Sequence, residues 1–277
     1  PTEGMEVSVN STRAEKSRSM VFELLVSDQP SKEQSPDPDS KFWNWSEKMG
    51  VSTSRFPSKE KINIDRSHKA MSVNLDACIN CNLCVRACRE VQVNDVIGMA
   101  YRGSTAKVIF DLDDPMGEST CVACGECVQA CPTGALIESS LVNEQGTRVN
   151  YADRVVDSLC PFCGVGCQTK VHVKDDKILH VDGKDGPANE NRLCVKGRFG
   201  FDYISHEGRL TKPLIRKAGV PKDANFQLKD SEISDYFEET SWENALDIAA
   251  KGLAKSKEEH GPKSLAGFGS AKCSNEE

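Results

Sequence analysis

The chemistry that this chain could perform is concentrated in its cysteines. There are 13 among 277 residues, and all but one fall into three tight groups. The stretch "CINCNLCVRAC" at residues 78–88 recurs as "CVACGECVQAC" at residues 121–131, with all four cysteines in register. Each copy has the spacing C-x2-C-x2-C-x3-C, and Pro132 follows the second copy. This pattern is typical of a protein that binds two [4Fe–4S] clusters.

In such a run the first three thiolates converge on one cluster, whereas the fourth starts a helix and reaches the other cluster. One cluster is therefore expected on Cys78, Cys81, Cys84 and Cys131. The second cluster is expected on Cys88, Cys121, Cys124 and Cys127. Two clusters bound in this way lie close together and conduct electrons. Structural zinc is the alternative, but zinc sites usually separate two CxxC pairs by a longer loop.

A third group of cysteines begins in the stretch "LCPFCGVGCQ" at residues 159–168. Because the first eight cysteines already complete two clusters, we expect a third [4Fe–4S] cluster on Cys160, Cys163, Cys167 and Cys194. A predicted hairpin and the loop "DGKDGPANENR" fill the gap before Cys194, so this cluster is expected to cap a small domain of its own. Cys273 stands apart from the three groups.

The composition excludes several classes of protein. The net charge is −7 and the pI is near 5.4, which argues against a dedicated nucleic-acid binder. No apolar run approaches the roughly 18 residues of a membrane span, and no export signal is present. Grouped thiols in a reducing compartment usually bind metal, so we expect a cytoplasmic protein. The chain starts at Pro1 and stops without a closing element, which we interpret as a piece of a longer polypeptide.

The elements that must position these cysteines can be read from the pattern of apolar and turn-forming residues. We expect a short strand at residues 5–9, a helix over 13–27 with Ser11 as N-cap, and an exposed connection at 29–40. The aromatic stretch "FWNW" at 42–45 is expected to anchor that connection by packing, and the lone His68 is expected to be structural.

Alternation between apolar and polar residues predicts two hairpins. The first covers residues 96–111 and turns at 102–105, and the second covers 169–183 and turns at Asp175 and Asp176. Near the end of the chain, Ser241 caps a predicted helix that stops at Gly261. The stretch "SLAGFG" at 264–269 is then expected to be a strand.

The third group lies in a stretch that resembles a known family. The segments "CPFCGVGCQTKVHVKDDKILHVDG" and "NRLCVKGRFGFDYISHEGRLTKPLIR" resemble the N-terminal cluster domain of molybdopterin-dependent oxidoreductases. Together with the preceding ferredoxin repeat and "DLDDPMGESTCVACGECVQACPTGAL", they resemble the catalytic alpha subunit of cytosolic NAD-linked formate dehydrogenases. The resemblance runs from about Glu3 to the end of the chain.

This resemblance implies a further cofactor and a partner. Molybdenum or tungsten would be held by bis(molybdopterin guanine dinucleotide) beside the third cluster. The two ferredoxin clusters would carry electrons from formate to a beta subunit that binds flavin and reduces NAD. Lys196 is implied to lie between cluster and pterin, and Ser270 and Asn275 lie in a turn that faces the pterin dinucleotide. The metal-ligating cysteine or selenocysteine of the family lies beyond Cys273, so residues 1–277 alone are expected to be inactive on formate.

The expected fold class is α+β, in four parts. Residues 1–68 would be a strand, a helix and a linker, the remnant of an upstream domain. Because residues 27–45 hold neither cysteine nor histidine, the His/Cys-ligated cluster found upstream in related subunits cannot form. Residues 69–150 would be a ferredoxin-like domain, 153–215 the third-cluster domain, and 238–277 the beginning of an α/β molybdopterin-binding domain.

Three other readings of the cysteines remain. An electron-transfer subunit of an NADH:quinone oxidoreductase shares the third-cluster pattern, although it typically has no duplicated ferredoxin directly before it. An iron-only hydrogenase has the ferredoxin repeat, but its active-site cysteine motifs do not occur here. Another molybdopterin enzyme, such as a nitrate reductase, stays open because substrate-contacting residues would lie beyond Glu277.

Overall fold

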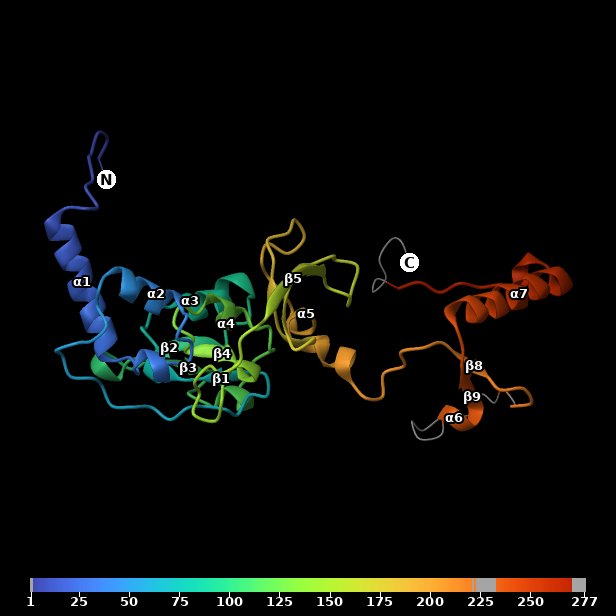
Figure 1. Ribbon diagram of the computed structural model, residues 1–277. Coiled ribbons are helices and arrows are strands. Elements are labelled where there is room, and N and C mark those ends of the chain that lie inside the picture. The colour runs from blue at the N-terminus through green and yellow to red at the C-terminus, as the bar shows by residue number, and fades with distance from the viewer. Residues whose placement is uncertain (1, 221, 223–232, 271–277) are drawn as a thin grey trace. The chain divides into compact units, whose positions relative to one another are not determined.

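The chain forms two compact units, residues 1–201 and 202–277. The computed structural model describes residues 2–220, 222 and 233–270 (Figure 1). All three cysteine groups lie in the first unit. Within the described residues, no helix combines the length and the apolar character that crossing a membrane would require.

The amino-terminal segment forms two helices, each capped by a serine. α1 (Thr12–Ser27) follows Ser11, and α2 (Lys41–Lys48) follows Ser40. In each case the serine side chain accepts a hydrogen bond of 3.3 Å from the backbone N–H three residues further on. These bonds satisfy amide groups that have no partner within the helix. The predicted first helix and its cap are confirmed.

Two predictions for this segment are wrong. Residues 5–9 form no strand: their side chains are exposed, and no strand of the described chain pairs with them to take up their hydrogen bonds. Residues 29–40 are not simply exposed, because Ser35, Pro36 and Ser40 are buried. The cause is packing against later parts of the chain, where the Thr147 hydroxyl donates to the Gln34 carbonyl at 3.1 Å.

The aromatic stretch anchors this connection through two of its three rings. Phe42 and Trp43 are buried, and Phe42 stacks on Phe22 of α1 with 5.9 Å between ring centroids. The backbone N–H of Phe42 donates to the carbonyl of Pro132 at 2.9 Å, directly after the second repeat. Trp45 is about half exposed, so the expectation that the aromatic stretch packs against the protein is wrong for this residue. A helix presents residues two apart on opposite sides, which puts Trp45 on the solvent side.

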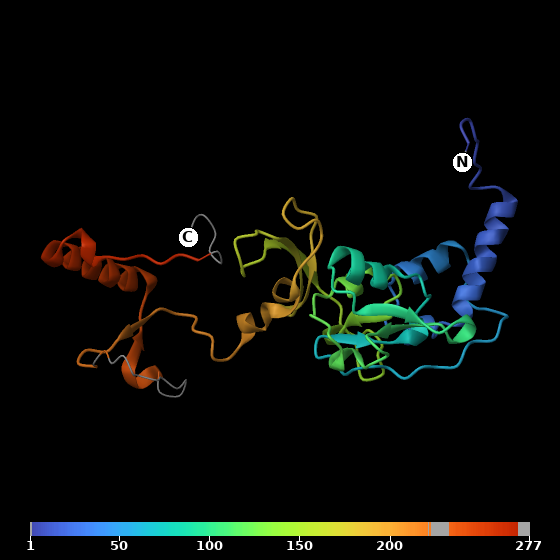
Figure 2. The ribbon, with the colours of Figure 1, turned by 180° about the vertical axis from the view of Figure 1, so that it is seen from behind.

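Two small antiparallel sheets frame the repeats. β1 (Met71–Val73) pairs with β4 (Leu136–Glu138), which joins the chain before the first repeat to the chain after the second. β2 (Ile97–Ala100) pairs with β3 (Lys107–Phe110) and forms the predicted hairpin between the repeats. The two copies are therefore closed into one body (Figure 2).

Each repeat contains a short helix, and its start differs from the prediction. α3 (Leu83–Arg86) continues into a π-helical turn over Ala87–Val91, and α4 (Glu126–Ala130) ends one residue before Cys131. Cys88 thus lies inside the helical run of the first copy and Cys131 directly follows the helix of the second copy, so neither fourth cysteine starts a helix. The reason is a left-handed residue before each helix, Asn82 with φ +62° and Gly125 with φ +72°, which turns the chain into the helix earlier.

The main hydrophobic core surrounds the cysteines of the repeats. Met71 is fully buried, and Val96, Val108 and Phe110 are at most 5% exposed. Cys84, Cys88 and Cys127 belong to the same buried cluster. These three thiols therefore lie in apolar surroundings, whereas Cys81 of the first repeat is exposed.

The third cysteine group is carried by a three-stranded antiparallel sheet. β5 (Arg154–Leu159), β6 (Gln168–Lys174) and β7 (Lys177–Gly183) follow one another in the sheet, and α5 (Val195–Phe199) packs beside β7 in both views (Figures 1 and 2). The predicted hairpin is confirmed, with positive φ at Asp175 and Asp176. β5 was not predicted, because its side chains are exposed on both faces and show no alternation.

The described residues of the second unit form one sheet and one long helix. β8 (Leu214–Arg216) pairs with β9 (Phe237–Glu239), which follows α6 (Ile233–Tyr236). The predicted helix is α7 (Trp242–His260), capped by Ser241 and ended by Gly261 with φ +80°. The predicted strand at 264–269 is wrong, because these residues pair with no strand of the described chain. The four domain boundaries stay predictions.

Short 3-10 turns complete the two units. They lie at Lys32–Gln34, Leu75–Ala77, Gly103–Thr105, Met116–Glu118, Ser139–Leu141, Gly200–Ser205 and Pro262–Ser264. Two of them frame the first repeat: Leu75–Ala77 leads into Cys78, and Gly103–Thr105 forms the turn of the β2–β3 hairpin.

The burial of Met71 in the core predicts that shortening this side chain strongly lowers the stability of the fold. The Met71→Ala variant should lose about 2–5 kcal/mol of unfolding free energy, because it removes a fully buried side chain beside the cysteines. Met5→Ala is the matched control, since Met5 is 55% exposed. Urea unfolding of the reconstituted chain measures both. Equal midpoints for the two variants would contradict this account of the core.

Candidate metal centres

The first cysteine set consists of Cys78, Cys81, Cys84 and Cys131, which line one apolar pocket together with Val108 and Leu136. The backbone N–H of Asn80 donates to the sulfur of Cys78 at 3.4 Å. The sulfur of Cys131 lies 3.5 Å from the hydroxyl oxygen of Thr133. Three of these cysteines come from the first repeat and one from the second.

The second cysteine set consists of Cys88, Cys121, Cys124 and Cys127, which line a separate pocket with Val96 and Ile97. Backbone N–H groups donate to two of its sulfurs, from Val96 to Cys88 at 3.3 Å and from Ala123 to Cys121 at 3.4 Å. The amide of Asn94 lies 4.0 Å from the sulfur of Cys124. The fold thus brings together the crossed groups that the spacing predicts.

The chemistry of both sets fits an iron–sulfur cluster. Burial, together with the neighbouring Cys131, Cys78 and Cys81, raises the pKa of the Cys84 thiol to about 12. Burial also raises the pKa of the Cys127 thiol well above its ordinary value. Four thiolates can share such a pocket only when bound cations offset their charge. The twelve described cysteines are free of disulfides, and N–H groups already point at three of the sulfurs.

The third cysteine set consists of Cys160, Cys163, Cys167 and Cys194. The first three lie on the loop between β5 and β6, where the N–H of Cys160 donates to the carbonyl of Cys167 at 2.9 Å. Cys194 directly precedes α5. The helix approaches the set closely, because a Cβ on Gly197 would lie 3.4 Å from the sulfur of Cys160.

The third set is less buried than the other two. Cys163 and Cys194 are exposed, whereas Cys160 and Cys167 are half-buried. Burial raises the pKa of Cys167, and the neighbouring Cys160, Cys163 and Cys194 raise it further, as expected for four thiols that face one another. The third set has the same donor chemistry as the first two.

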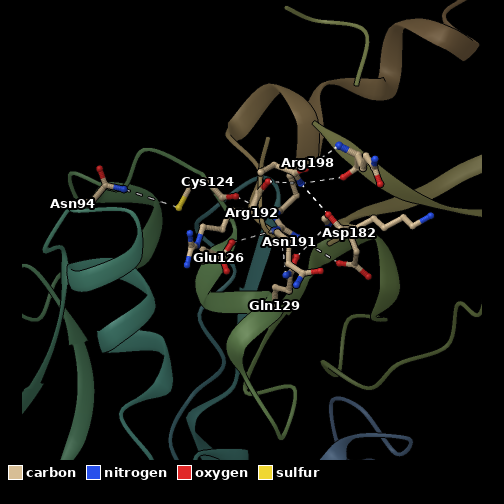
Figure 3. A network of polar contacts seen from close by, with 12 residues as sticks. Asn94, Cys124, Glu126, Gln129, Asp182, Asn191, Arg192 and Arg198 are labelled. Carbon is tan, nitrogen blue, oxygen red and sulfur yellow. Dashed lines mark hydrogen bonds and ion pairs between the residues drawn. The ribbon is translucent and has the colours of Figure 1, made fainter. Parts of the chain in front are cut away.

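Sequence reasoning missed Arg198, four residues after Cys194. Its side chain is completely buried, and its three nitrogens have separate partners (Figure 3). Nε donates to the carbonyl of Cys124 at 3.0 Å, Nη2 to Oε1 of Gln129 at 2.8 Å, and Nη1 to Oδ1 of Asp182 at 3.3 Å. In the sequence, Arg198 appears only as a second basic residue two positions after Lys196. That spacing does not reveal that Arg198 is buried and Lys196 exposed.

Comparison with known families follows the same division of the chain. Residues 77–135 match the description "4Fe-4S dicluster domain", 153–206 match "Molybdopterin oxidoreductase Fe4S4 domain", and 209–277 match "Molybdopterin oxidoreductase". The chain carries the domains of the molybdopterin oxidoreductase family. The resemblance at family level is confirmed, and so is a mixed helix and strand fold with ferredoxin-like and molybdopterin oxidoreductase domains.

Curated relatives are similar to the chain over most of its length. A Bacillus subtilis strain 168 protein named "Probable oxidoreductase YjgC" is 34% identical over 249 residues, which covers 77% of this chain and 24% of that protein. A Staphylococcus aureus strain USA300 protein named "Putative formate dehydrogenase" is 33% identical over 236 residues, which covers 72% of this chain and 22% of that protein. The chain therefore spans about a quarter of the length of these relatives.

A solved structure is also similar to part of the chain. The crystal structure of an NAD+-reducing [NiFe]-hydrogenase in the H2-reduced state superimposes with a TM-score of 0.46 and 23% identity. The match covers 53% of this chain and 65% of that chain.

The family resemblance implies three residues at the pterin, and the structure describes two of them. Lys196 is on α5 and exposed, two residues after Cys194. Ser270 is exposed at the end of the described second unit. Asn275 and Cys273 lie outside the described residues. His68 is half-buried, and its ring accepts a hydrogen bond from the N–H of Ala70 at 3.2 Å, as suits a structural role.

A buried pair of histidines lies next to Arg198's partner Asp182. His172 of β6 faces His180 of β7, and the rings stack with 3.9 Å between centroids. Oδ2 of Asp182 is 3.1 Å from Nε2 of His172 and 3.7 Å from Nε2 of His180. Burial, together with the neighbouring His172, lowers the pKa of His180 to about 4. His180 is therefore neutral in the folded protein near neutral pH.

The low pKa of His180 predicts acid sensitivity. Between pH 6.5 and about 4 the unfolded chain binds a proton that the folded chain does not, so stability falls as the pH drops through this window. The full loss is about 3 kcal/mol. His180→Leu should remove this part of the pH dependence, whereas His260→Gln, which changes a histidine with 69% of its side chain exposed, should not. Urea unfolding at several pH values between 6.5 and about 4 gives the slope of stability against pH for each variant. Parallel slopes for parent and His180→Leu would exclude His180 as the cause.

Proposed function

We propose that the chain is the iron–sulfur electron-transfer part of a molybdenum- or tungsten-containing formate dehydrogenase. The crossed sharing of cysteines between the two repeats carries the proposal, because it places two four-thiol sets side by side in one core. The molybdopterin oxidoreductase matches and the formate dehydrogenase name of a relative support the rest.

Each cofactor has named residues in this proposal. The three cysteine sets hold three [4Fe–4S] clusters, and each cluster when bound exchanges one electron at a time. The family resemblance implies that Lys196, Ser270 and Asn275 would contact the bis(molybdopterin guanine dinucleotide), whose metal would supply the chemistry on formate. The repeats supply an apolar setting and N–H donors to sulfur, which stabilise the charge of a bound cluster.

The electrons that leave the repeats need a partner. We propose a beta subunit that carries flavin and reduces NAD, in the cytoplasm, on the basis of the family resemblance. We assign the exit toward such a subunit to the first and second sets, because the family resemblance implies that the two ferredoxin clusters carry electrons outward. Residues 1–277 alone are proposed to be inactive on formate.

Crossed ligation can be tested by single substitutions. The parent chain, reconstituted with iron and sulfide, should bind about twelve irons, and Cys131→Ser should damage the cluster of the first set alone. Its electron paramagnetic resonance spectrum should therefore match that of Cys78→Ser, although these residues belong to different repeats. Cys121→Ser is the control, because it lies in the same repeat as Cys131 but belongs to the second set.

Two results would count against the proposal. If Cys131→Ser matches Cys121→Ser, each repeat binds its own cluster and the crossed arrangement is wrong. If the parent binds about four or eight irons, or stoichiometric zinc, the three-cluster function is wrong.

The proposed role of Lys196 predicts a change in potential. A positive charge near a cluster favours its reduced form, so Lys196→Ala should lower the midpoint potential of the third cluster by roughly tens of millivolts. Lys177→Ala is the matched control, because it removes an exposed lysine from the start of β7 in the same unit. Lys196→Arg should restore the potential. Redox titration of the third cluster measures all three, and an unchanged midpoint in Lys196→Ala would leave Lys196 without this role.

A further inference from the structure

Arg198 is hydrogen-bonded to a cysteine of two different sets. Its backbone N–H donates to the carbonyl of Cys194 in the third set at 3.1 Å. Its Nε donates to the carbonyl of Cys124 in the second set at 3.0 Å. One residue, with one hydrogen bond on each side, therefore joins the third set to the second (Figure 3).

The contact is built tightly around the arginine. The Arg198 side chain is 0% exposed, and a Cβ on Gly125 would lie 2.1 Å from its Cδ. Gly125 also has a φ of +72°, which favours glycine. No other residue type fits at position 125 without moving Arg198 or the loop that carries Cys124.

The neighbours of Arg198 hold the same two parts together. Oε1 of Gln129, on α4, accepts from Arg198 at 2.8 Å and from the N–H of Gly183 at 3.2 Å. Nε2 of Gln129 donates to the carbonyl of Asn191 at 2.8 Å. Asp182 approaches the guanidinium from β7 and Glu126 from α4. The repeat side thus supplies two neutral acceptors and a carboxylate, and β7 supplies a second carboxylate, which together offset the cost of burying the charge.

The guanidinium group suits this position better than an ammonium group would. Its nitrogens diverge in a fixed plane toward Cys124, Gln129 and Asp182 at the same time. A lysine carries the same charge on a single nitrogen, so it can meet one of these directions but not all three. Arginine therefore fixes orientation as well as charge.

We propose that Arg198 is a positioning residue that sets the approach of the third cysteine set to the second, and that electrons cross at the Cys194–Arg198–Cys124 junction. The inference rests on the proposed function. In this step the cluster of the third set is oxidised by one electron and that of the second set is reduced by one. No covalent bond forms or breaks, and no proton moves. The first set then receives the electron after the second.

The test uses the full chain reconstituted with iron and sulfide, with dithionite or a flash photoreductant as the electron source. Arg198→Met removes the charge and the hydrogen-bond donors. Arg198→Lys keeps the charge but removes the planar guanidinium group. Arg154→Met is the matched control, because Arg154 is an exposed arginine of the same unit that pairs with Asp176 at 2.7 Å. Three readouts apply to each variant: iron content, magnetic coupling between the reduced clusters, and the rate of electron exchange after the flash.

The parent and Arg154→Met should show the same coupling and rate. Both Arg198 variants should bind as much iron as the parent, lose the coupling between the second and third clusters, and exchange electrons roughly tenfold or more slowly. The factor follows from the loss of a charge-assisted hydrogen bond that holds the docked arrangement. The coupling depends on distance, so a residue that only stabilises the fold would not change it at constant iron content.

The outcomes separate this inference from the function on which it rests. A parent chain without three clusters overturns the proposed function and the inference together. If the parent has three coupled clusters and Arg198→Lys keeps the coupling and the rate of the parent, the inference alone is overturned. If Arg198→Met binds less iron, Arg198→Lys decides the question by the same two readouts.

Discussion

Neither cysteine set of the repeats is complete without a thiol from the other copy. Cys131 crosses to the first set and Cys88 to the second, so both copies must fold together before either pocket has four sulfurs. This constraint explains the pairing of β1 with β4, which fastens the start of the first repeat to the end of the second. It also explains why Cys84, Cys88 and Cys127 lie in the main core: the sides of the copies that face each other are the apolar sides. Burial raises the pKa of Cys84 and Cys127, so these two thiols stay protonated until cations bind, and folding and metal binding are coupled.

The amino-terminal segment is held in place by the same end of the repeats. The N–H of Phe42 donates to the carbonyl of Pro132, and Asp37 pairs with Arg148 at 3.0 Å. Residues 1–67 hold neither cysteine nor histidine, and buried side chains of α1 and α2 pack against Ile79, next to Cys78 of the first set. An isolated helix of the length of α1 is marginal in water, which makes its contacts with α2 necessary for both helices.

Cysteine spacing predicted the membership of the first two sets, because ligand geometry leaves few ways to place four sulfurs around one cluster. The two hairpins and α7 were predicted from alternation, turn residues and caps, all of which are local signals. The errors concern contacts between distant segments: residues 29–40 look like an exposed linker until Thr147 and Arg148 pack on them. β5 escaped notice because it is exposed on both faces, and Arg198 because burial of an arginine depends on acceptors from α4, β7 and the Cys124 loop. No pattern within a few residues encodes such a convergence.

The two basic residues of α5 show how the buried contact governs the exposed one. Lys196 and Arg198 are two positions apart, and about 100° per residue in an α-helix places them on nearly opposite sides. Fixing the guanidinium against Cys124 therefore fixes the direction of Lys196, which lies in solvent on the other side of the helix. Cys194 is joined to the same turn by the N–H of Arg198, so its position is tied to that of α5. A change at Arg198 would thus shift Cys194 and Lys196 together, relative to the three cysteines on the loop between β5 and β6.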